Sequence, residues 1–288
     1  MLRRLWLHRS DGKRIKHHDP ILRLIPYVMP KRYDAQVFFS ETCDVTHTDQ
    51  WIKQQRRQND IKLMLLHVMI SAGIRTMAEY PKLNRFVSGS KVYARNHIAI
   101  SFAIKKEMTI DAPETVIKVI FDPQDTLLDV MHKTNAAIAN NQALDQSNKT
   151  DRFARLLNLL PGWLLSSAFF FIKSADYHRL LPRKLIDLSP FHSSTFITDL
   201  GSLGVEPVYH HIYDLGTTSM FLAFGLKRKS QNAEGRTKHL TIKLVLDERI
   251  TDGFYFAQAF KRFIRLVKEP ETLLEPVKTL GIDHEIRA

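Results

Sequence analysis

The sequence predicts an α/β protein in which helices pack on a sheet. Segments with the two-residue alternation of a strand recur along the chain, and segments with the three- and four-residue spacing of a helix separate them. The chain has 288 residues, of which 44% are hydrophobic, so it is long enough to bury a substantial core. Its 25% of charged residues is ordinary for a globular protein, which argues against a disordered or fibrous chain.

The first half of the chain contains three predicted strands and two predicted helices. The first strand covers residues 35–42, which are rich in β-favouring types and lack Gly and Pro. Asp60 is the predicted N-cap of a helix that ends near Tyr80 and Pro81, because a residue before proline leaves the helical region. This helix places Ile61, Leu65, Val68 and Ala72 on one face. Strands 98–105 and 115–121 and a helix over 126–140 follow.

The second half repeats the alternation of helices and strands. Residues 140–151 are the best linker candidate, and residues 152–188 are predicted to be helical. Strands are predicted over 194–200, 219–226 and 238–247. In the last strand the side chains of Leu240, Ile242, Leu244 and Leu246 point to one face. Asp252 stands at the N-cap of a final helix with Phe256, Phe260, Phe263 and Val267 on one side.

The cysteine content and the N-terminus indicate a cytoplasmic protein. Cys43 is the only cysteine, so the chain forms no internal disulfide and no Cys-based zinc site, and no metal is expected. We expect Cys43 to act as a small apolar residue at a strand end. The N-terminal residues lack the apolar run of a secretory signal.

The longest apolar stretch, residues 156–172, is interrupted by Asn158, Pro161, Gly162 and two serines. It therefore falls short of the roughly 20 unbroken apolar residues of a membrane span. Three interpretations remain open: a buried helix, which is the default, an oligomer contact, or a helix lying at a membrane surface.

The net charge of +12 would attract polyanions such as nucleic acids, anionic lipids or the phosphates of a coenzyme. The basic clusters, including Lys13-Arg14-Ile15-Lys16, are short and spread along the chain. No known nucleic-acid motif accompanies them, so no nucleic-acid partner is expected and a solvated basic surface is the simplest interpretation.

The most informative stretch of the sequence is Asp247-Glu248-Arg249-Ile250-Thr251-Asp252-Gly253. It resembles the C-terminal signature of the dihydrolipoyl acyltransferases of 2-oxoacid dehydrogenase complexes, in which Asp-His-Arg and two further residues precede Asp-Gly. Chloramphenicol acetyltransferases share the His-x-x-x-Asp-Gly core of that signature. Glu248 stands where the family has its catalytic His.

Other segments resemble the same superfamily in the same order. Residues 196–204, Phe-Ile-Thr-Asp-Leu-Gly-Ser-Leu-Gly, are similar to its Thr-Ile-Ser-Asn-Leu-Gly strand and turn, and residues 219–225 to the strand that follows. Residues 80–84 and 43–46 resemble a Pro-x-Leu-Asn turn and an acidic strand end. The resemblance implies a chloramphenicol acetyltransferase-like domain over 14–280, with a mixed sheet and packed helices. It also implies a helical insertion near 150–190, an N-terminal extension over 1–13 and a tail over 281–288.

The resemblance also implies a reaction, the transfer of an acyl group from acyl-coenzyme A to a thiol or hydroxyl acceptor. In the family the His takes the acceptor's proton, and a hydroxyl of the Thr-Ile-Ser strand stabilises the oxyanion. Thr198 matches that hydroxyl residue, although an ordinary strand threonine explains it as well. Glu248 is the weaker base near neutral pH and, when ionised, only accepts hydrogen bonds.

Three further residues are candidates for the site. Asp252 belongs to the signature, but its N-cap role alone explains it. His210 and His211 are candidates for a replacement base, because the family's corresponding segment runs close to the active-site channel. If they lie on a strand, adjacent side chains face opposite sides and at most one of the two would point into the site. A single histidine with an ordinary structural role is the simpler explanation.

The chain also departs from the lipoyl enzymes. Residues 105–114 replace their Asp-Gly-Leu and Pro-Val segment, which puts the lipoamide and coenzyme A channel in doubt, and residues 1–30 are too few for a lipoyl-bearing domain.

Three hypotheses about the function follow from the sequence. The protein is an acyl-coenzyme A dependent acyltransferase, a non-catalytic relative that keeps the homotrimer as a scaffold or binding module, or a protein peripheral to anionic membranes.

Overall fold

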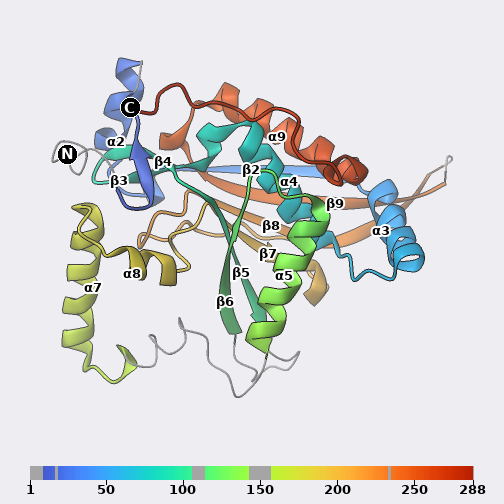
Figure 1. Cartoon of the computed structure of the whole chain (residues 1–288), viewed down its shortest axis with the longest axis horizontal. Helices are drawn as coiled ribbons and strands as arrows, with labels where there is room; N and C mark the ends of the chain where they lie inside the picture. The colour runs from blue at the N-terminus through green and yellow to red at the C-terminus, as the bar shows by residue number, and fades with distance from the viewer. Residues whose placement is uncertain (1–8, 17–18, 106–113, 143–156, 233–234, 288) are drawn as a thin grey trace.

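The computed structural model describes residues 9–16, 19–105, 114–142, 157–232 and 235–287. The predicted α/β architecture is confirmed (Figure 1). A mixed six-stranded sheet has the strand order β2-β9-β8-β7-β5-β6, and a small antiparallel sheet has the order β1-β4-β3. The large sheet contains β2 (Gln36–Asp44), β9 (Gly235–Asp247), β8 (Met220–Asn232), β7 (Thr195–Asp199), β5 (Ile98–Lys105) and β6 (Glu114–Phe121). The small one contains β1 (Gly12–Arg14), β4 (Lys91–Arg95) and β3 (Arg85–Ser88).

Helices cover one face of the large sheet. The main core lies between this face and three helices, α4 (Leu65–Glu79), α5 (Leu127–Gln142) and α9 (Gly253–Lys268), while α3 (Thr46–Asn59) packs beside β9. Figure 1 shows α7 (Gly162–Tyr177) and α8 (Arg183–Leu188) at the end of the molecule opposite α3. The short helix α2 (Pro20–Val28) lies next to the small sheet.

The other face of the sheet carries a smaller cluster made of Phe196, Ile212, Phe221 and Val245. The three strand residues of this cluster stand opposite one another in the ladders of β7, β8 and β9, so they share one face. The segment 205–213, which has no regular secondary structure, covers part of this face. Its Val205 carbonyl accepts a hydrogen bond from the Leu226 amide at 2.9 Å.

The strand predictions match the structure closely, because alternation and β-branched composition are local properties. Residues 98–105 form β5 as predicted, and β6 begins one residue earlier than expected. Leu240, Ile242, Leu244 and Leu246 all lie in the main core. Phe256, Phe263 and Val267 of the last helix are buried there too, with Phe260 packed against them.

The start of the predicted helix after residue 60 was wrong. Residues 46–59 form α3, a helix that the sequence analysis missed, and Asp60 is its C-cap in the left-handed conformation, with φ of 50°. The next helix, α4, begins only at Leu65, and Ile61 precedes it. The amide of Met64, just before this helix, donates to Nδ1 of His67 at 3.1 Å. Asp is among the residues that tolerate the left-handed region, so the same side chain is compatible with either helix end.

Two other predictions need correction. Residues 85–95 form the hairpin of β3 and β4, which was not predicted in detail. The predicted helical region 152–188 is divided into α7 and α8 by a break over 178–182, and residues 152–156 lie outside the described part. The linker candidate 140–151 begins inside α5, and residues 143–151 are likewise outside it.

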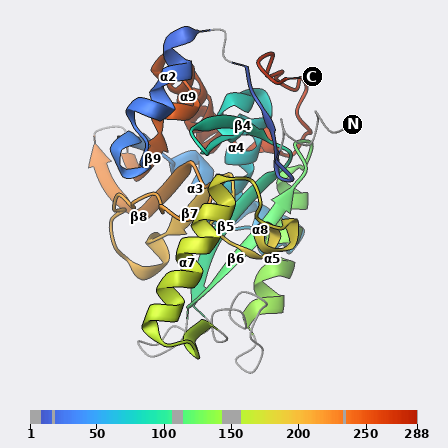
Figure 2. The same ribbon diagram turned by 90° about the vertical axis from the view of Figure 1, so that its left-hand side faces the viewer.

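Helix α7 is exposed, so burial within this chain, the default interpretation of residues 156–172, was wrong. Trp163, Phe170 and Phe171 are 72%, 69% and 68% exposed. Figure 2 shows α7 on the outside of the molecule. No helix within the described ranges has the length and apolar composition needed to cross a membrane.

Both terminal segments pack on the domain where the structure describes them. Arg9 is buried and donates hydrogen bonds to Asp11 at 2.8 Å and to Asp176 of α7 at 2.7 Å. At the other end, Asp283 forms a buried ion pair with Arg85. The terminal segments are thus tied to the structure, and the predicted division into 1–13, 14–280 and 281–288 stays a prediction.

Candidate active site

The turn that links β9 to α9 is held by a buried ion pair. Asp247 ends β9 and is wholly buried. Each of its carboxylate oxygens accepts a hydrogen bond of 2.7 Å from the guanidinium of Arg249, and Oδ1 also accepts from the Arg249 amide at 3.2 Å. Arg249 in turn donates to the Met29 carbonyl at 2.9 Å. Hydrogen bonds within the turn therefore fix its shape, and the bond to Met29 ties it to the segment after α2.

A second buried arginine strengthens this frame. Arg32 lies 3.6 Å from the Asp247 carboxylate and donates to the carbonyls of Val87, at 2.9 Å, and Gly216, at 2.6 Å. Burial lowers the pKa of Arg32, and the charge of Asp247 opposes that effect. Two cations thus share one buried carboxylate, which makes Asp247 the electrostatic centre of the turn.

Glu248 projects from this fixed turn into solvent. It begins the short 3-10 turn Glu248–Ile250, and its side chain is exposed. Among the described residues none forms a hydrogen bond or ion pair with its carboxylate. The backbone position of Glu248 is rigidly defined, while its carboxylate is available to a molecule that approaches from outside.

Asp252 acts as the N-cap of α9. Its Oδ1 accepts a hydrogen bond from the Tyr255 amide at 2.8 Å. Such a cap contributes about 1 kcal/mol to stability. The geometry therefore gives Asp252 a structural role, and its predicted place in the site stays a prediction.

Thr198 lies on β7, on the sheet face away from the helices. It follows Phe196 by two residues, so its side chain points to the same face as the small cluster that contains Phe196. Thr198 is half-buried and stands opposite Ala223 of β8. Its hydroxyl is therefore placed beside the surface that the 205–213 segment covers.

His210 lies on the same face, in the 205–213 segment. Its ring stacks on Phe221 with a centroid distance of 4.2 Å, and no described residue pairs with its buried Nε2 atom. Burial, together with the charge of His211, lowers the pKa of His210. His211 is exposed and contacts the ring of Tyr213 edge-on at 5.0 Å. Of the two histidines, His210 is the one whose ring packs on the sheet face that also carries Thr198.

Thr198 and Glu248 do not meet within one chain. Thr198 stands opposite Ala223, which stands opposite Lys243 of β9, five residues before Glu248. With about 3.3 Å per residue along a strand and about 4.8 Å between strands, the two residues are roughly 19 Å apart. A single copy of the chain therefore does not bring its predicted base and its predicted oxyanion donor together.

Comparisons with known proteins identify the fold. The structure resembles chloramphenicol acetyltransferase with a TM-score of 0.57 and 11% identity, over 89% of this chain and all of the other. The chain has the chloramphenicol acetyltransferase-like fold. The Azotobacter vinelandii dihydrolipoamide acetyltransferase, studied for a serine, a histidine and an asparagine in its catalytic mechanism, matches over 90% of this chain and 94% of its own, with a TM-score of 0.55 and 16% identity.

A third structure with the same fold is a probable dihydrolipoamide acetyltransferase from Listeria monocytogenes. It has a TM-score of 0.54 and 13% identity, and the match covers 90% of this chain and 95% of the other. No protein-family model matches the sequence, and no curated protein matches it significantly. The chloramphenicol acetyltransferase-like fold and the acyltransferase-like architecture of the neighbours agree with the resemblance seen in the sequence.

Sequence analysis missed the residues that hold the site in place. Arg32 lies 215 positions before Asp247 in the chain, and no local pattern links the two. The sequence around Arg32 gave only a weak indication that this arginine needs a distant partner, because few acidic residues lie near it in the chain. Cys43 is buried and burial raises its pKa to about 11, in agreement with its predicted apolar role.

Proposed function

We propose that this protein transfers an acyl group from a coenzyme A thioester to a thiol or hydroxyl acceptor, in a site formed between two copies of the chain. The observation that carries the proposal is the fixed turn around Glu248. A buried carboxylate and two buried arginines fix the backbone from which the exposed Glu248 side chain projects, and a glutamate that only faces solvent does not need such a frame. The neighbours named as acetyltransferases support the reaction class.

The separation of Thr198 from Glu248 supports a site between copies. Groups that exchange a proton must come within about 3 Å of each other or of a shared substrate atom. In a closed ring of identical chains, Glu248 of one copy faces the same surface of the next copy at every interface. One neighbour is the cubic core of a pyruvate dehydrogenase complex, so the fold is compatible with assembly. We propose a homotrimer for this chain.

In the proposed reaction Glu248 takes the proton from the acceptor's S–H or O–H group. The acceptor sulfur or oxygen then forms a bond to the thioester carbonyl carbon, and the Thr198 hydroxyl donates a hydrogen bond to the oxyanion. The carbon–sulfur bond to coenzyme A breaks, and Glu248 gives the proton that it took from the acceptor to the departing thiolate. His210 is the alternative base, because it lies on the Thr198 face and its lowered pKa keeps it neutral near pH 7.

A second candidate function is a non-catalytic scaffold. It is favoured by the exposure of Glu248 and by the absence of any described partner that would orient or activate its carboxylate. On this hypothesis the trimer and the turn remain, but proton transfer is lost because an ionised carboxylate lacks the two-ended hydrogen bonding of an imidazole.

The test measures release of the coenzyme A thiol from acetyl- and longer acyl-coenzyme A with a panel of thiol and hydroxyl acceptors. If Glu248 is the base, Glu248→Gln lowers turnover by about 100-fold or more. Glu41→Gln, on an exposed position of β2, is the matched control and leaves turnover unchanged. His210→Gln, compared with His211→Gln, tests the alternative base in the same assay.

Glu248→His separates the two candidate functions. If the native protein is inactive and Glu248→His is active while Glu41→His is not, the chain is a scaffold that retains the rest of the site. If neither the native protein nor Glu248→His turns over any substrate of the panel, acyl transfer is wrong for this chain.

The site between copies has its own test. Thr198→Ala and Glu248→Gln protomers are each expected to be inactive alone. Random mixing of equal amounts places an intact Thr198 beside an intact Glu248 at about one interface in four, so about a quarter of the native activity returns. No recovery from a mixture that has demonstrably exchanged subunits contradicts the shared site.

A further inference from the structure

Helix α7 presents a line of aromatic side chains to the outside of the molecule. Trp163, Phe170 and Tyr177 follow one another at intervals of seven residues, which places them on nearly the same side of the helix. They are 72%, 69% and 52% exposed. Phe171 and Leu164 form a second line beside the first and are 68% and 37% exposed. At about 1.5 Å per residue, this apolar strip is roughly 21 Å long.

The other side of α7 is anchored to the protein. Asp176 is buried there, and its carboxylate accepts a hydrogen bond of 2.7 Å from Arg9 and lies 3.3 Å from Nε2 of His192. The Asp176 carbonyl accepts a hydrogen bond of 3.0 Å from the Ser88 hydroxyl of the β3–β4 hairpin. These contacts fix the C-terminal end of the helix, so the apolar strip is held facing outward (Figure 2).

The surroundings of the apolar strip are positively charged. Residues 157–188 contain four Lys or Arg and two Asp. Asp176 is buried and bonded inward, so the exposed carboxylate of this segment is that of Asp187. Lys173 and Arg183 pair with exposed aspartates, and exposed pairs of this kind are weak. These cations are therefore accessible to an anion that approaches from outside.

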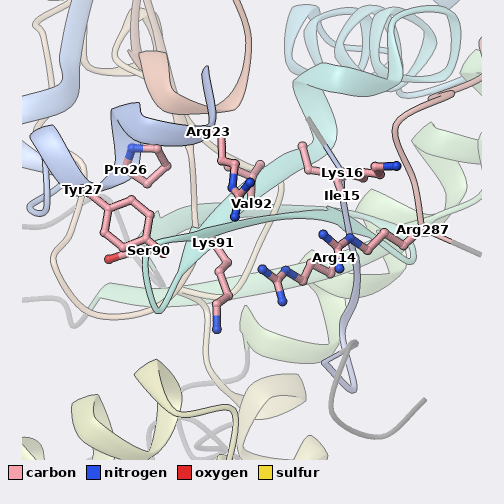
Figure 3. A pocket seen from close by; sticks show the side chains of 10 residues that line it. All are labelled: Arg14, Ile15, Lys16, Arg23, Pro26, Tyr27, Ser90, Lys91, Val92 and Arg287. Carbon is pink, nitrogen blue, oxygen red and sulfur yellow. The ribbon is translucent and has the colours of Figure 1, made fainter. Parts of the chain in front are cut away.

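The positive charge continues beyond the C-terminal end of α7. Arg14, Lys91 and Arg287 line one pocket beside β1 (Figure 3). Burial, followed by the charges of Arg14 and Arg179, lowers the pKa of Lys91. Arg179, two residues after α7, therefore lies near this group. An anionic surface that meets the apolar strip is thus attracted by the cations at its end.

The dimensions and composition of α7 suit the surface of a bilayer and not its interior. The helix has 16 residues and is about 24 Å long, whereas the hydrocarbon core of a bilayer is about 30 Å thick. Helices that lie at a bilayer surface place Trp, Phe and Leu at the boundary between headgroups and acyl chains and keep cations among the headgroups. The apolar strip and the basic residues around it have this combination.

A second copy of the chain fits the apolar strip less well. A second copy with its own α7 at the contact would bring the same cations there, and like charges repel, whereas an anionic leaflet attracts basic residues. The aromatic side chains also project from a helix on the outside of the molecule (Figure 2). A protein partner needs a matching groove for such side chains, and a fluid bilayer does not.

We propose that α7 docks this protein on the surface of an anionic lipid bilayer. Trp163, Phe170 and Phe171 enter the boundary between headgroups and acyl chains, and Lys173 and Arg183 face the headgroups. The proposal goes beyond acyl transfer and does not rest on it, because binding is measured without acyl-coenzyme A.

The experiment measures co-sedimentation of the full chain with vesicles of equal parts phosphatidylcholine and phosphatidylglycerol. Vesicles of phosphatidylcholine alone are the lipid control, and binding to the mixed vesicles should weaken as the salt concentration rises. Phe170→Ser and Phe171→Ser should each weaken binding about tenfold, since each removes a large apolar side chain from the lipid. Leu203→Ser is the matched control, because Leu203 is 56% exposed and follows β7 toward the end of the sheet where α3 packs.

Trp163 provides a second measurement on the native chain. Lipids that carry bromine on their acyl chains quench the fluorescence of a tryptophan that enters the bilayer. Trp163→Phe should remove the quenched part of the signal. The melting temperatures of Phe170→Ser and Phe171→Ser should stay close to native, because the side chains that they change are exposed, and this shows that the variants are folded.

Salt-sensitive binding to the mixed vesicles that depends on Phe170 and Phe171 supports the proposal. The proposal is overturned if the chain does not sediment with the mixed vesicles, if phosphatidylcholine alone binds it as strongly, or if Leu203→Ser weakens binding as much as Phe170→Ser. It is also overturned if Phe170→Ser lowers the oligomeric state of the lipid-free chain in analytical ultracentrifugation, because α7 then lies between copies of the chain.

Discussion

Asp247→Asn tests whether the buried ion pair fixes the turn that carries Glu248. The substitution keeps the shape of the side chain but removes its charge. Asp247 is wholly buried, both of its oxygens accept from Arg249 at 2.7 Å, and Arg32 lies 3.6 Å away. Two buried guanidinium groups would thus lose their nearest carboxylate. Removal of one partner from a buried ion pair costs about 3–5 kcal/mol.

That cost is a large part of the total stability of an ordinary domain, which is about 5–15 kcal/mol. We expect a free energy of unfolding lower by about 3 kcal/mol and a melting temperature lower by roughly 10 °C. Urea unfolding, followed by circular dichroism, measures the first quantity. Protein concentration must be held constant because an oligomer gains apparent stability with concentration.

Two variants make the result specific. Asp252→Asn is the control, because Asn caps a helix as well as Asp does, and the stability of this variant should stay close to native. Combining Asp247→Asn with Arg249→Met should cost less than the sum of the two single substitutions, since Arg249 no longer leaves an unpaired charge and only Arg32 loses its carboxylate. A loss below about 1 kcal/mol for Asp247→Asn, or strict additivity in the double variant, refutes the reasoning.

Two further predictions concern pH and backbone conformation. Burial lowers the pKa of His67 to about 4, so the unfolded chain takes up a proton near pH 6.5 before the folded one does. The contribution of His67 to stability is therefore full above pH 6.5 and falls by about 2 kcal/mol by pH 5. His67→Gln should flatten this pH dependence of unfolding, and exposed His47→Gln should not; equal slopes in all three proteins would contradict the assignment. Gly216 has φ of 87°, and a Cβ there would lie 2.2 Å from the Phe191 carbonyl oxygen. Gly216→Ala should cost at least about 2 kcal/mol, whereas Gly73→Ala, inside α4 with open space around it, should gain about 0.5–1 kcal/mol in urea unfolding. If Gly216→Ala leaves the free energy of unfolding unchanged, the loop around Gly216 relaxes to accept the new methyl group and the reasoning is wrong.

Local patterns were sufficient for most of the strands and for the last helix. The alternation in β9 predicted which of its side chains enter the core, because the pleat of a strand fixes side-chain direction within the strand itself. The helix boundary near Asp60 could not be settled in this way. An aspartate is compatible with the beginning of one helix and with the left-handed end of another, and only packing decides between them.

The candidate site was predicted as a set of residues but not as an arrangement. The signature fixed the register of Glu248, and the order of the matching segments indicated the chloramphenicol acetyltransferase-like fold. The sequence contained no information on the distance of roughly 19 Å between Thr198 and Glu248, because that distance follows from the strand order β7-β8-β9. It also left His210 and His211 equivalent, whereas the structure stacks only His210 on Phe221.

By itself the sequence determined most of the strands, the turn at Glu248 and the excess of positive charge, because strand alternation, a short signature and net charge can each be read without knowing what lies nearby. The tertiary structure alone decided which distant groups meet. Arg32 reaches Asp247, and Arg14, Lys91 and Arg287 converge on one pocket, from segments far apart in the chain. Electrostatic interactions depend on distance in space, and chain folding sets that distance.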